Sequence, residues 1–104
     1  MCNLIRQHLS YINFKDDDEG VHFYTGLQTY VKFLFVFSTL GLAVFYLNYL
    51  YGSVSKIVVY DQFFLVLMKM RRHPVNFELG RLFGITEHDV YNIFCTWVRF
   101  MALQ

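Results

Sequence analysis

Nine polar side chains in the C-terminal half of the sequence have the types and spacing needed to contact nucleic acid. Four lie close together and suit hydrogen bonding to base edges: Glu87, His88, Tyr91 and Asn92. Asn92 is of the residue type that pairs bidentately with adenine in the major groove. The other five are cations suited to phosphate oxygens: Lys69, Arg71, Arg72, Arg81 and Arg99. Contacts between cations and phosphates supply much of the affinity for DNA and make that affinity depend on salt.

Two short helices joined by a glycine turn, between Asn76 and Phe94, are predicted to position these residues. Asn76 and Thr86 are side-chain acceptors directly before apolar-periodic runs, where an N-cap satisfies backbone N–H groups. Gly84 lies between the runs, where a left-handed residue ends a helix, and Gly80 would let the two backbones approach closely. This spacing predicts a helix-turn-helix, in which the N-terminal part of the second helix enters the major groove.

The second of these helices is predicted to have a core face and a partner face. The core face carries apolar residues at helical spacing: Val90, Ile93, Phe94, Trp97 and Met101. We expect Trp97 to pack in this core rather than stack on bases. The face that we expect to be exposed carries most of the base-reading candidates: His88, Asn92, Cys95 and Arg99, flanked by Tyr91 and Thr96.

A third helix is predicted upstream, from Asp61 as its capping residue to the cations before Pro74. It completes a three-helix unit, and the segment from Lys56 to Tyr60 reads as a connector packed onto it. The predicted fold class is therefore all-α. We expect an N-terminal helical region over residues 1–55, with an acidic linker and an apolar central helix, and a helix-turn-helix domain over residues 56–104.

Length, net charge and apolar content limit the number of domains and the kinds of partner that the chain can have. The chain has 104 residues, a net charge of +1 and 56% apolar residues. That length fits one domain, and the apolar share predicts extensive helix packing or a surface covered by a partner. From Lys56 onward six Lys and Arg residues stand against four acids, so the C-terminal half is mildly basic.

No catalytic constellation is found in the sequence. It lacks a Ser-His-Asp elbow, a phosphate-cradling glycine loop, and HExxH or CxxC spacing. The acidic run from Asp16 to Glu19 lacks the alternating register of a calcium loop and predicts a solvated linker. Cys2 and Cys95 form no disulfide framework. We therefore predict no metal site, no cofactor and no enzymatic activity.

The apolar segment after Leu27 has two interpretations. No charged residue lies between Lys32 and Lys56, and this length suffices to span a bilayer. Polar residues and Gly41 interrupt the run, however, and a helix that is apolar all round is also typical of a buried central helix. Gly41 is expected to bend or split the helix. The alternative function is thus a small membrane-associated or protein-interaction protein that uses residues 33–50.

Several blocks of the sequence resemble the helix-turn-helix region of DDE-superfamily transposases of the cut-and-paste, Harbinger-like kind. The blocks are YDQFFLVLMKMRR (60–72) and NFELGRLFGITEHDVYNIFCTWVRFMALQ (76–104). HFYTGL (22–27) and FYLNYLYGS (45–53) resemble the region upstream of that helix-turn-helix. The resemblance implies binding of double-stranded transposon-end DNA or an adopted site, and a nuclear location. It also favours a buried helix over a membrane span.

The resemblance also implies protein partners, and the sequence departs from the family pattern at one place. The catalytic carboxylates are expected in a ribonuclease-H-like domain further along, so a downstream catalytic domain or a second copy of the chain is an expected partner. None of the acids here matches that catalytic triad. The recognition helix starts with Glu87, His88 and Asp89, where the family usually carries Ser, Thr and Arg. A capping box between Thr86 and Asp89 would turn the second acid toward its own backbone.

Overall fold

Helices make up the regular structure of the part of the chain that can be described. The computed structural model describes residues 10–41, 44–45, 49, 52 and 57–102. A 3-10 turn, η1, comes first, and five α-helices follow it: η1 Tyr11–Phe14, α1 Asp18–Thr25, α2 Tyr30–Thr39, α3 Val59–Arg72, α4 Asn76–Phe83 and α5 Glu87–Ala102. The described residues contain no strand, which confirms the all-α prediction.

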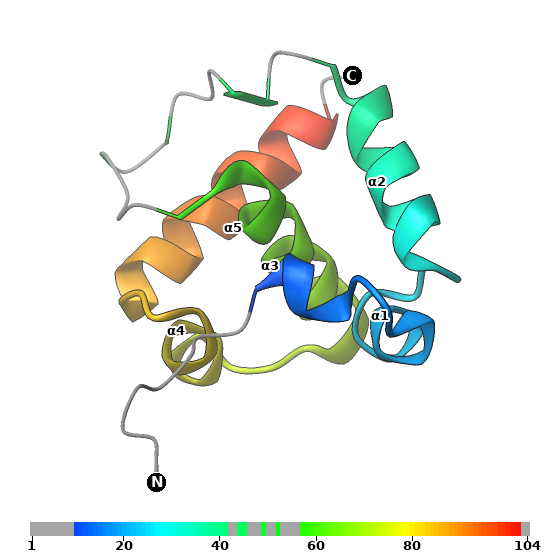
Figure 1. Ribbon diagram of the computed structural model, residues 1–104. Helices are drawn as coiled ribbons and strands as arrows, with labels where there is room; N and C mark the ends of the chain where they lie inside the picture. Colours follow the sequence, from blue (N-terminus) through cyan, green and yellow to red (C-terminus); the bar gives the residue numbers. More distant parts are fainter. Residues whose placement is uncertain (1–9, 42–43, 46–48, 50–51, 53–56, 103–104) are drawn as a thin grey trace, which may run out of the picture.

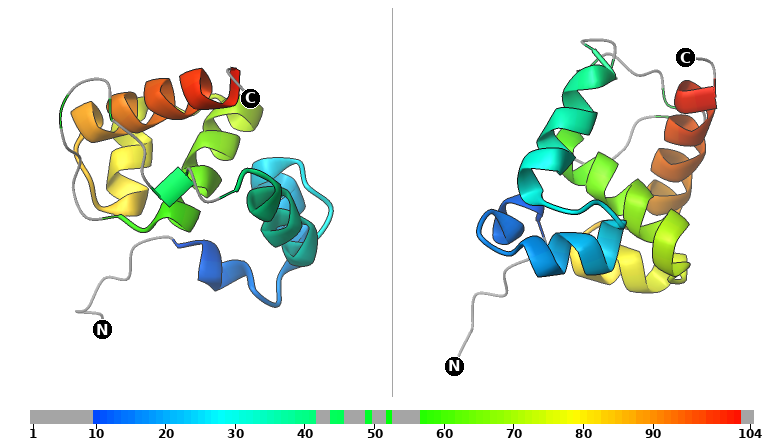
Figure 2. Two further views of the ribbon diagram at one scale, coloured as in Figure 1. Left: turned by 90° about the horizontal axis from the view of Figure 1, so that it is seen from above. Right: turned by 90° about the vertical axis from the view of Figure 1, so that its right-hand side faces the viewer.

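Helix α3 is the centre of the packing. It lies between α1 and α2 on one side and α4 and α5 on the other (Figures 1 and 2). Because helices cover α3 on both sides, its buried residues surround the helix rather than form one stripe: Gln62, Phe63, Phe64, Leu65, Val66 and Met68. A helix that is hydrophobic almost all round is one enclosed by neighbours. The predicted three-helix unit is therefore present, with α3 as its first helix.

Helix α2 occupies the start of the long apolar segment. Phe33 and Phe37 are buried against α3, with ring centroids 5.4 Å and 5.7 Å from that of Phe63. Val31 and Phe35 point outward and are 74% and 61% exposed. The helix thus buries one face only.

The helix ends at Thr39. Gly41 follows with a left-handed φ of 82°, so the segment is interrupted as expected. Among the described residues, no helix has both the length and the apolar character needed to cross a bilayer. Much of the rest of the segment, including residues 46–48 and 53–56, lies outside the described residues. Its use as an interaction surface stays a prediction.

The acidic run is not a linker, and this prediction is wrong. Asp17 is the N-cap of α1 and accepts a hydrogen bond from the Gly20 backbone N–H at 2.9 Å, while Asp18 and Glu19 form the first turn. Asp18 also accepts from the backbone N–H of Tyr30 at 2.9 Å. Carboxylates favour a helix N-terminus because they satisfy its N–H groups and oppose its dipole. The run therefore starts a helix.

Asp61 does not begin α3 as its cap, and this prediction is also wrong. The helix starts two residues earlier, at Val59, and Asp61 lies in its first turn. The Asp61 carboxylate accepts the Tyr11 backbone N–H at 2.7 Å and the Ser10 hydroxyl at 2.9 Å. Its role is to attach the N-terminal segment to α3.

Both regions predicted from the sequence contribute to one hydrophobic core. Phe14, Val21 and Phe33 of the first region belong to the same buried cluster as Leu79 and Trp97 of the second. Residues 53–56, where the boundary was predicted, lie outside the described residues. The division into 1–55 and 56–104 stays a prediction.

Candidate nucleic-acid interface

The glycine turn between α4 and α5 has the predicted geometry. Gly84 has a φ of 74°, the left-handed region that glycine adopts without steric cost, and its N–H bonds the Gly80 carbonyl. The Ile85 N–H donates to the same carbonyl at 2.9 Å. A Cβ added at Gly80 would lie 2.6 Å from the Ile85 carbonyl oxygen, which confirms the expected close approach. Two glycines therefore set the angle between α4 and α5.

One of the two predicted N-caps is confirmed and the other is wrong. The Thr86 hydroxyl oxygen accepts the Asp89 backbone N–H at 3.0 Å, at the start of α5. Asn76 is instead the first residue inside α4, and Val75 precedes it in extended conformation. The buried Oδ1 of Asn76 has no hydrogen-bond partner among the described residues. Because Asn76 lies inside the helix, its amide is not in position to cap.

The predicted core face of α5 is confirmed. Val90, Ile93 and Trp97 have no exposed surface, and Phe94 and Met101 are half-buried. The Trp97 indole N–H donates to Oε1 of Gln62 in α3 at 2.9 Å. This bond and the surrounding packing fix the rotation of α5 about its axis. They therefore determine which residues of α5 face outward.

Asn92 does not lie on the outward face, and the prediction that it does is wrong. The side chain is fully buried. Its Nδ2 donates to the Gly52 carbonyl at 2.8 Å, and its Oδ1 accepts from the Thr96 hydroxyl at 3.3 Å. A backbone carbonyl 40 residues earlier in the chain covers this flank of the helix. With its amide engaged inside the fold, Asn92 cannot reach a base edge in this conformation.

The other three base-reading candidates lie on one exposed face. The side chains of this face recur at helical spacing: Glu87, His88, Tyr91, Val98, Arg99 and Ala102 are exposed, and Cys95 is half-buried among them. Tyr91 is 48% exposed and Val98 39%. Asp89 is 6% exposed, so Glu87 is the outward carboxylate of the first turn of α5. We call this surface the outer face of α5. Reading of bases by Glu87, His88 and Tyr91 stays a prediction.

The five predicted phosphate ligands have different surroundings. Lys69 is half-buried, donates to the Pro74 carbonyl at 3.3 Å and lies 5.5 Å from the Phe94 ring centroid. Arg81, on α4, is exposed, and its guanidinium carbon lies 5.7 Å from the Phe77 ring centroid. Arg99 is exposed in the last turn of α5. Of these three cations, Arg81 and Arg99 are exposed to solvent.

The remaining two cations face α1. The guanidinium carbon of Arg72 lies 3.9 Å from the ring centroid of Phe23. Arg71 approaches Gly26, where an added Cβ would be 3.1 Å from its side chain. No pattern in the sequence indicates either contact, because α1 and the end of α3 are separated by some 50 residues of chain.

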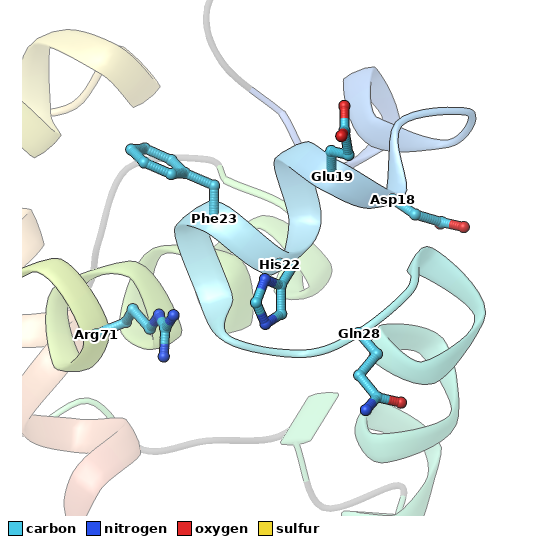
Figure 3. Close-up of a pocket in the computed structure, with 6 residues that line it drawn as sticks. All are labelled: Asp18, Glu19, His22, Phe23, Gln28 and Arg71. Carbon is cyan, nitrogen blue, oxygen red and sulfur yellow. The ribbon is translucent and has the colours of Figure 1, made fainter.

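Arg71 also lines an open pocket of about 430 Å³ at this corner, between α1, α3 and the start of α2 (Figure 3). The other lining residues are Asp18, Glu19, His22, Phe23 and Gln28. His22 is exposed in this pocket. Within the described part of the chain, no three His, Cys, Asp or Glu residues are placed to hold a metal ion.

Comparison with known protein families identifies the helical segment at the C-terminal end of the sequence. Residues 55–104 match the model of a family described as helix-turn-helix of DDE superfamily endonuclease. The matched segment contains α3, α4 and α5, and it begins one residue before the predicted domain. The match does not extend to the Harbinger-like subgroup, which stays a prediction. No curated protein sequence and no solved structure matches the chain.

Proposed function

Because residues 55–104 match the helix-turn-helix model of DDE superfamily endonucleases, we propose that they bind double-stranded DNA with the outer face of α5 in the major groove. The observation that supports this most directly is the exposure of Glu87, His88 and Tyr91 directly after the Gly84 turn. In a helix-turn-helix the N-terminal part of the second helix contacts base edges. This geometry explains why the polar residues collect there.

Helix α4 supplies the contact with the DNA backbone in this proposal. The first helix of a helix-turn-helix crosses the phosphates while the second lies in the groove. Arg81 is the exposed cation of α4, and Arg99 is exposed on α5 itself. The burial of Asp89 leaves Glu87 as the outward acid in the first turn of α5, which reduces repulsion of the phosphates. Arg81 is therefore the first residue to test.

The finer parts of the proposal concern the biological context. We propose that the DNA is a transposon end or a site adopted from one, that the protein acts in the nucleus, and that this chain supplies binding without catalysis. The match of the segment to this family model supports a transposase-related role. A downstream catalytic domain or a second copy of the chain is the protein partner we expect.

Binding to a labelled duplex over a series of salt concentrations tests the proposal. Each phosphate contact contributes about 0.9 to the slope of log affinity against log salt. We expect Arg81→Ala to reduce that slope by about 0.9 and to weaken binding to all duplexes alike. Lys32→Ala is the matched control, because Lys32 is an exposed cation on α2, outside the helix-turn-helix.

Two results would contradict the proposal. The intact protein would show no retention on duplex DNA at low salt, or Lys32→Ala would reduce the slope as much as Arg81→Ala does. The second result would mean that binding follows net charge rather than the helix-turn-helix. Circular dichroism of each variant verifies that the helices are formed.

A further inference from the structure

The N-terminal half of the outer face of α5 lacks the side chains that usually read purines in the major groove. From its first turn to its middle it presents an acid, an imidazole, a phenol and a thiol: Glu87, His88, Tyr91 and Cys95. Guanine is usually read by Arg or Lys, and adenine by Asn or Gln. Asn92 is the amide of this helix, and it is buried on the Gly52 carbonyl. Arg99, the cation of this face, is about 18 Å from Glu87 along the axis.

A carboxylate at the start of the face selects one base edge. Ionised Glu87 only accepts hydrogen bonds, so it needs a donor in the groove. The donors there are the amino groups of cytosine and adenine, and adenine also presents its N7 acceptor beside the amino group. That acceptor would repel a carboxylate. Glu and Asp therefore pair with the cytosine amino group.

A less polar ridge along the middle of the face selects a second edge. Tyr91, Cys95 and Val98 follow one another at intervals of four and three residues and form a ridge on the outer face. The C5-methyl of thymine is the apolar group that the major groove offers. From Glu87 to Cys95 the helix rises about 12 Å, which corresponds to about three or four base pairs at about 3.4 Å each.

We propose that α5 reads a run of pyrimidines on one DNA strand, cytosine through Glu87 and thymine methyl groups through the ridge of Tyr91, Cys95 and Val98. This inference rests on the proposed function and specifies its target. It replaces the adenine contact that the sequence suggested for Asn92. Cytosine amino groups and thymine methyl groups lie on the same side of the groove as their strand, so one helix face can follow both.

The test starts with selection of binding sites from a random duplex pool by the wild-type chain. We expect the selected sites to share a pyrimidine run that contains cytosine. Deoxyuridine in place of thymine then removes only the C5-methyl. Loss of one buried methyl contact corresponds to about fourfold weaker binding. In Tyr91→Ala, whose shortened ridge contacts the methyl less, thymine and deoxyuridine duplexes should bind more nearly alike.

Glu87→Gln provides the second arm of the test. A carboxylate becomes an amide of the same size, and glutamine pairs bidentately with adenine. We expect the preference at one base pair to change from cytosine to adenine by about fivefold or more. Lys32→Ala, which leaves the outer face intact, should select the wild-type sites.

The outcomes separate this inference from the proposed function. Duplex binding without a pyrimidine preference, or with equal affinity for thymine and deoxyuridine, would overturn the inference and leave the DNA-binding role standing. An unchanged cytosine preference in folded Glu87→Gln would overturn the role of Glu87. Absence of any duplex binding by the wild-type chain would instead refute the proposed function. A pyrimidine preference in the wild type, with weaker discrimination of thymine from deoxyuridine in Tyr91→Ala and an altered cytosine preference in Glu87→Gln, supports both.

Discussion

The side chain of Gln62 in α3 accepts the indole N–H of Trp97 in α5 at 2.9 Å, and both residues are almost fully buried. The same Oε1 atom accepts the Tyr49 hydroxyl at 2.9 Å, and Nε2 donates to the Ile57 carbonyl at 3.0 Å. One buried amide thus joins α5 to α3 and to the chain before it. The orientation of the outer face of α5 depends on this connection.

Gln62→Leu should destabilise the fold by about 2 kcal/mol, because the buried Trp97 N–H and Tyr49 hydroxyl would lose their acceptor. Urea unfolding followed by circular dichroism measures the change. Trp97→Phe in the Gln62→Leu background should cost less than in the wild type, since the unpaired N–H is then absent. If Trp97→Phe lowered the free energy of unfolding equally in the wild type and in Gln62→Leu, the hydrogen bond between the two residues would contribute no coupling energy.

Gly80→Ala should lower the free energy of unfolding by about 1–3 kcal/mol, because the new methyl group would overlap the Ile85 carbonyl and push α4 from α5. DNA affinity should fall as well, since the angle between these helices aligns the groove-facing residues. The matched substitution is Gly84→Asn in the adjacent turn, where asparagine tolerates the left-handed conformation better than other residues. If Gly80→Ala were at least as stable as Gly84→Asn, the close approach of the Gly80 and Ile85 backbones would not require glycine at position 80.

Asn92→Ala should behave as a structural variant rather than a base-reading one. Its loss leaves the Gly52 carbonyl and the Thr96 hydroxyl without their present partner, at a cost of about 1–3 kcal/mol. The folded variant should select the same DNA sites as the wild type. Lys32→Ala is the control and should change stability by only about 0.5 kcal/mol, because Lys32 is exposed on α2. If folded Asn92→Ala instead changed the preference at one base pair, Asn92 would contact that base and would not be a purely structural residue.

The difference between Asn92 and Trp97 shows what the sequence could predict. Periodicity placed Trp97 on the core stripe, and local rules placed Thr86 as a cap and Gly84 in the turn; all three are confirmed. These features depend on residues within about one or two helical turns. Asn92 depends on the Gly52 carbonyl, which no local pattern connects to it.

The same limit applies to Asp61 and Arg72. Asp61 is predicted from the sequence to cap α3, but it accepts the backbone N–H of Tyr11, some 50 residues earlier. Arg72 is predicted as a phosphate ligand, and no local pattern indicates that its guanidinium lies over the ring of Phe23 in α1. Side chains of this kind have several possible partners, and the tertiary fold selects among them. The candidate site was therefore predictable as a helix and a turn, but not in the choice of outward residues.

The fold should become less stable as the pH rises above about 10, the ordinary pKa of tyrosine. The reason is that the folded state favours the neutral form of Tyr30. Tyr30 stacks on Tyr11 with ring centroids 6.3 Å apart, and Tyr11 stacks on Tyr60 at 4.9 Å. Burial raises the pKa of Tyr30, and the charges of Tyr11 and Tyr60 raise it further. The folded state thus favours the neutral phenol. This stabilisation is complete below the unfolded pKa and is lost as the pH rises through the folded pKa.

Urea unfolding of the wild type and of Tyr30→Phe between pH 8 and about pH 11 measures this contribution, because phenylalanine keeps the ring and removes the titrating hydroxyl. We expect the free energy of unfolding of the wild type to fall more steeply than that of the variant over the upper part of this range. The ionised phenol is harder to accommodate in the stack than in the unfolded chain. Parallel curves for the two proteins would mean that Tyr30 titrates alike in both states and that the stack does not hold it neutral.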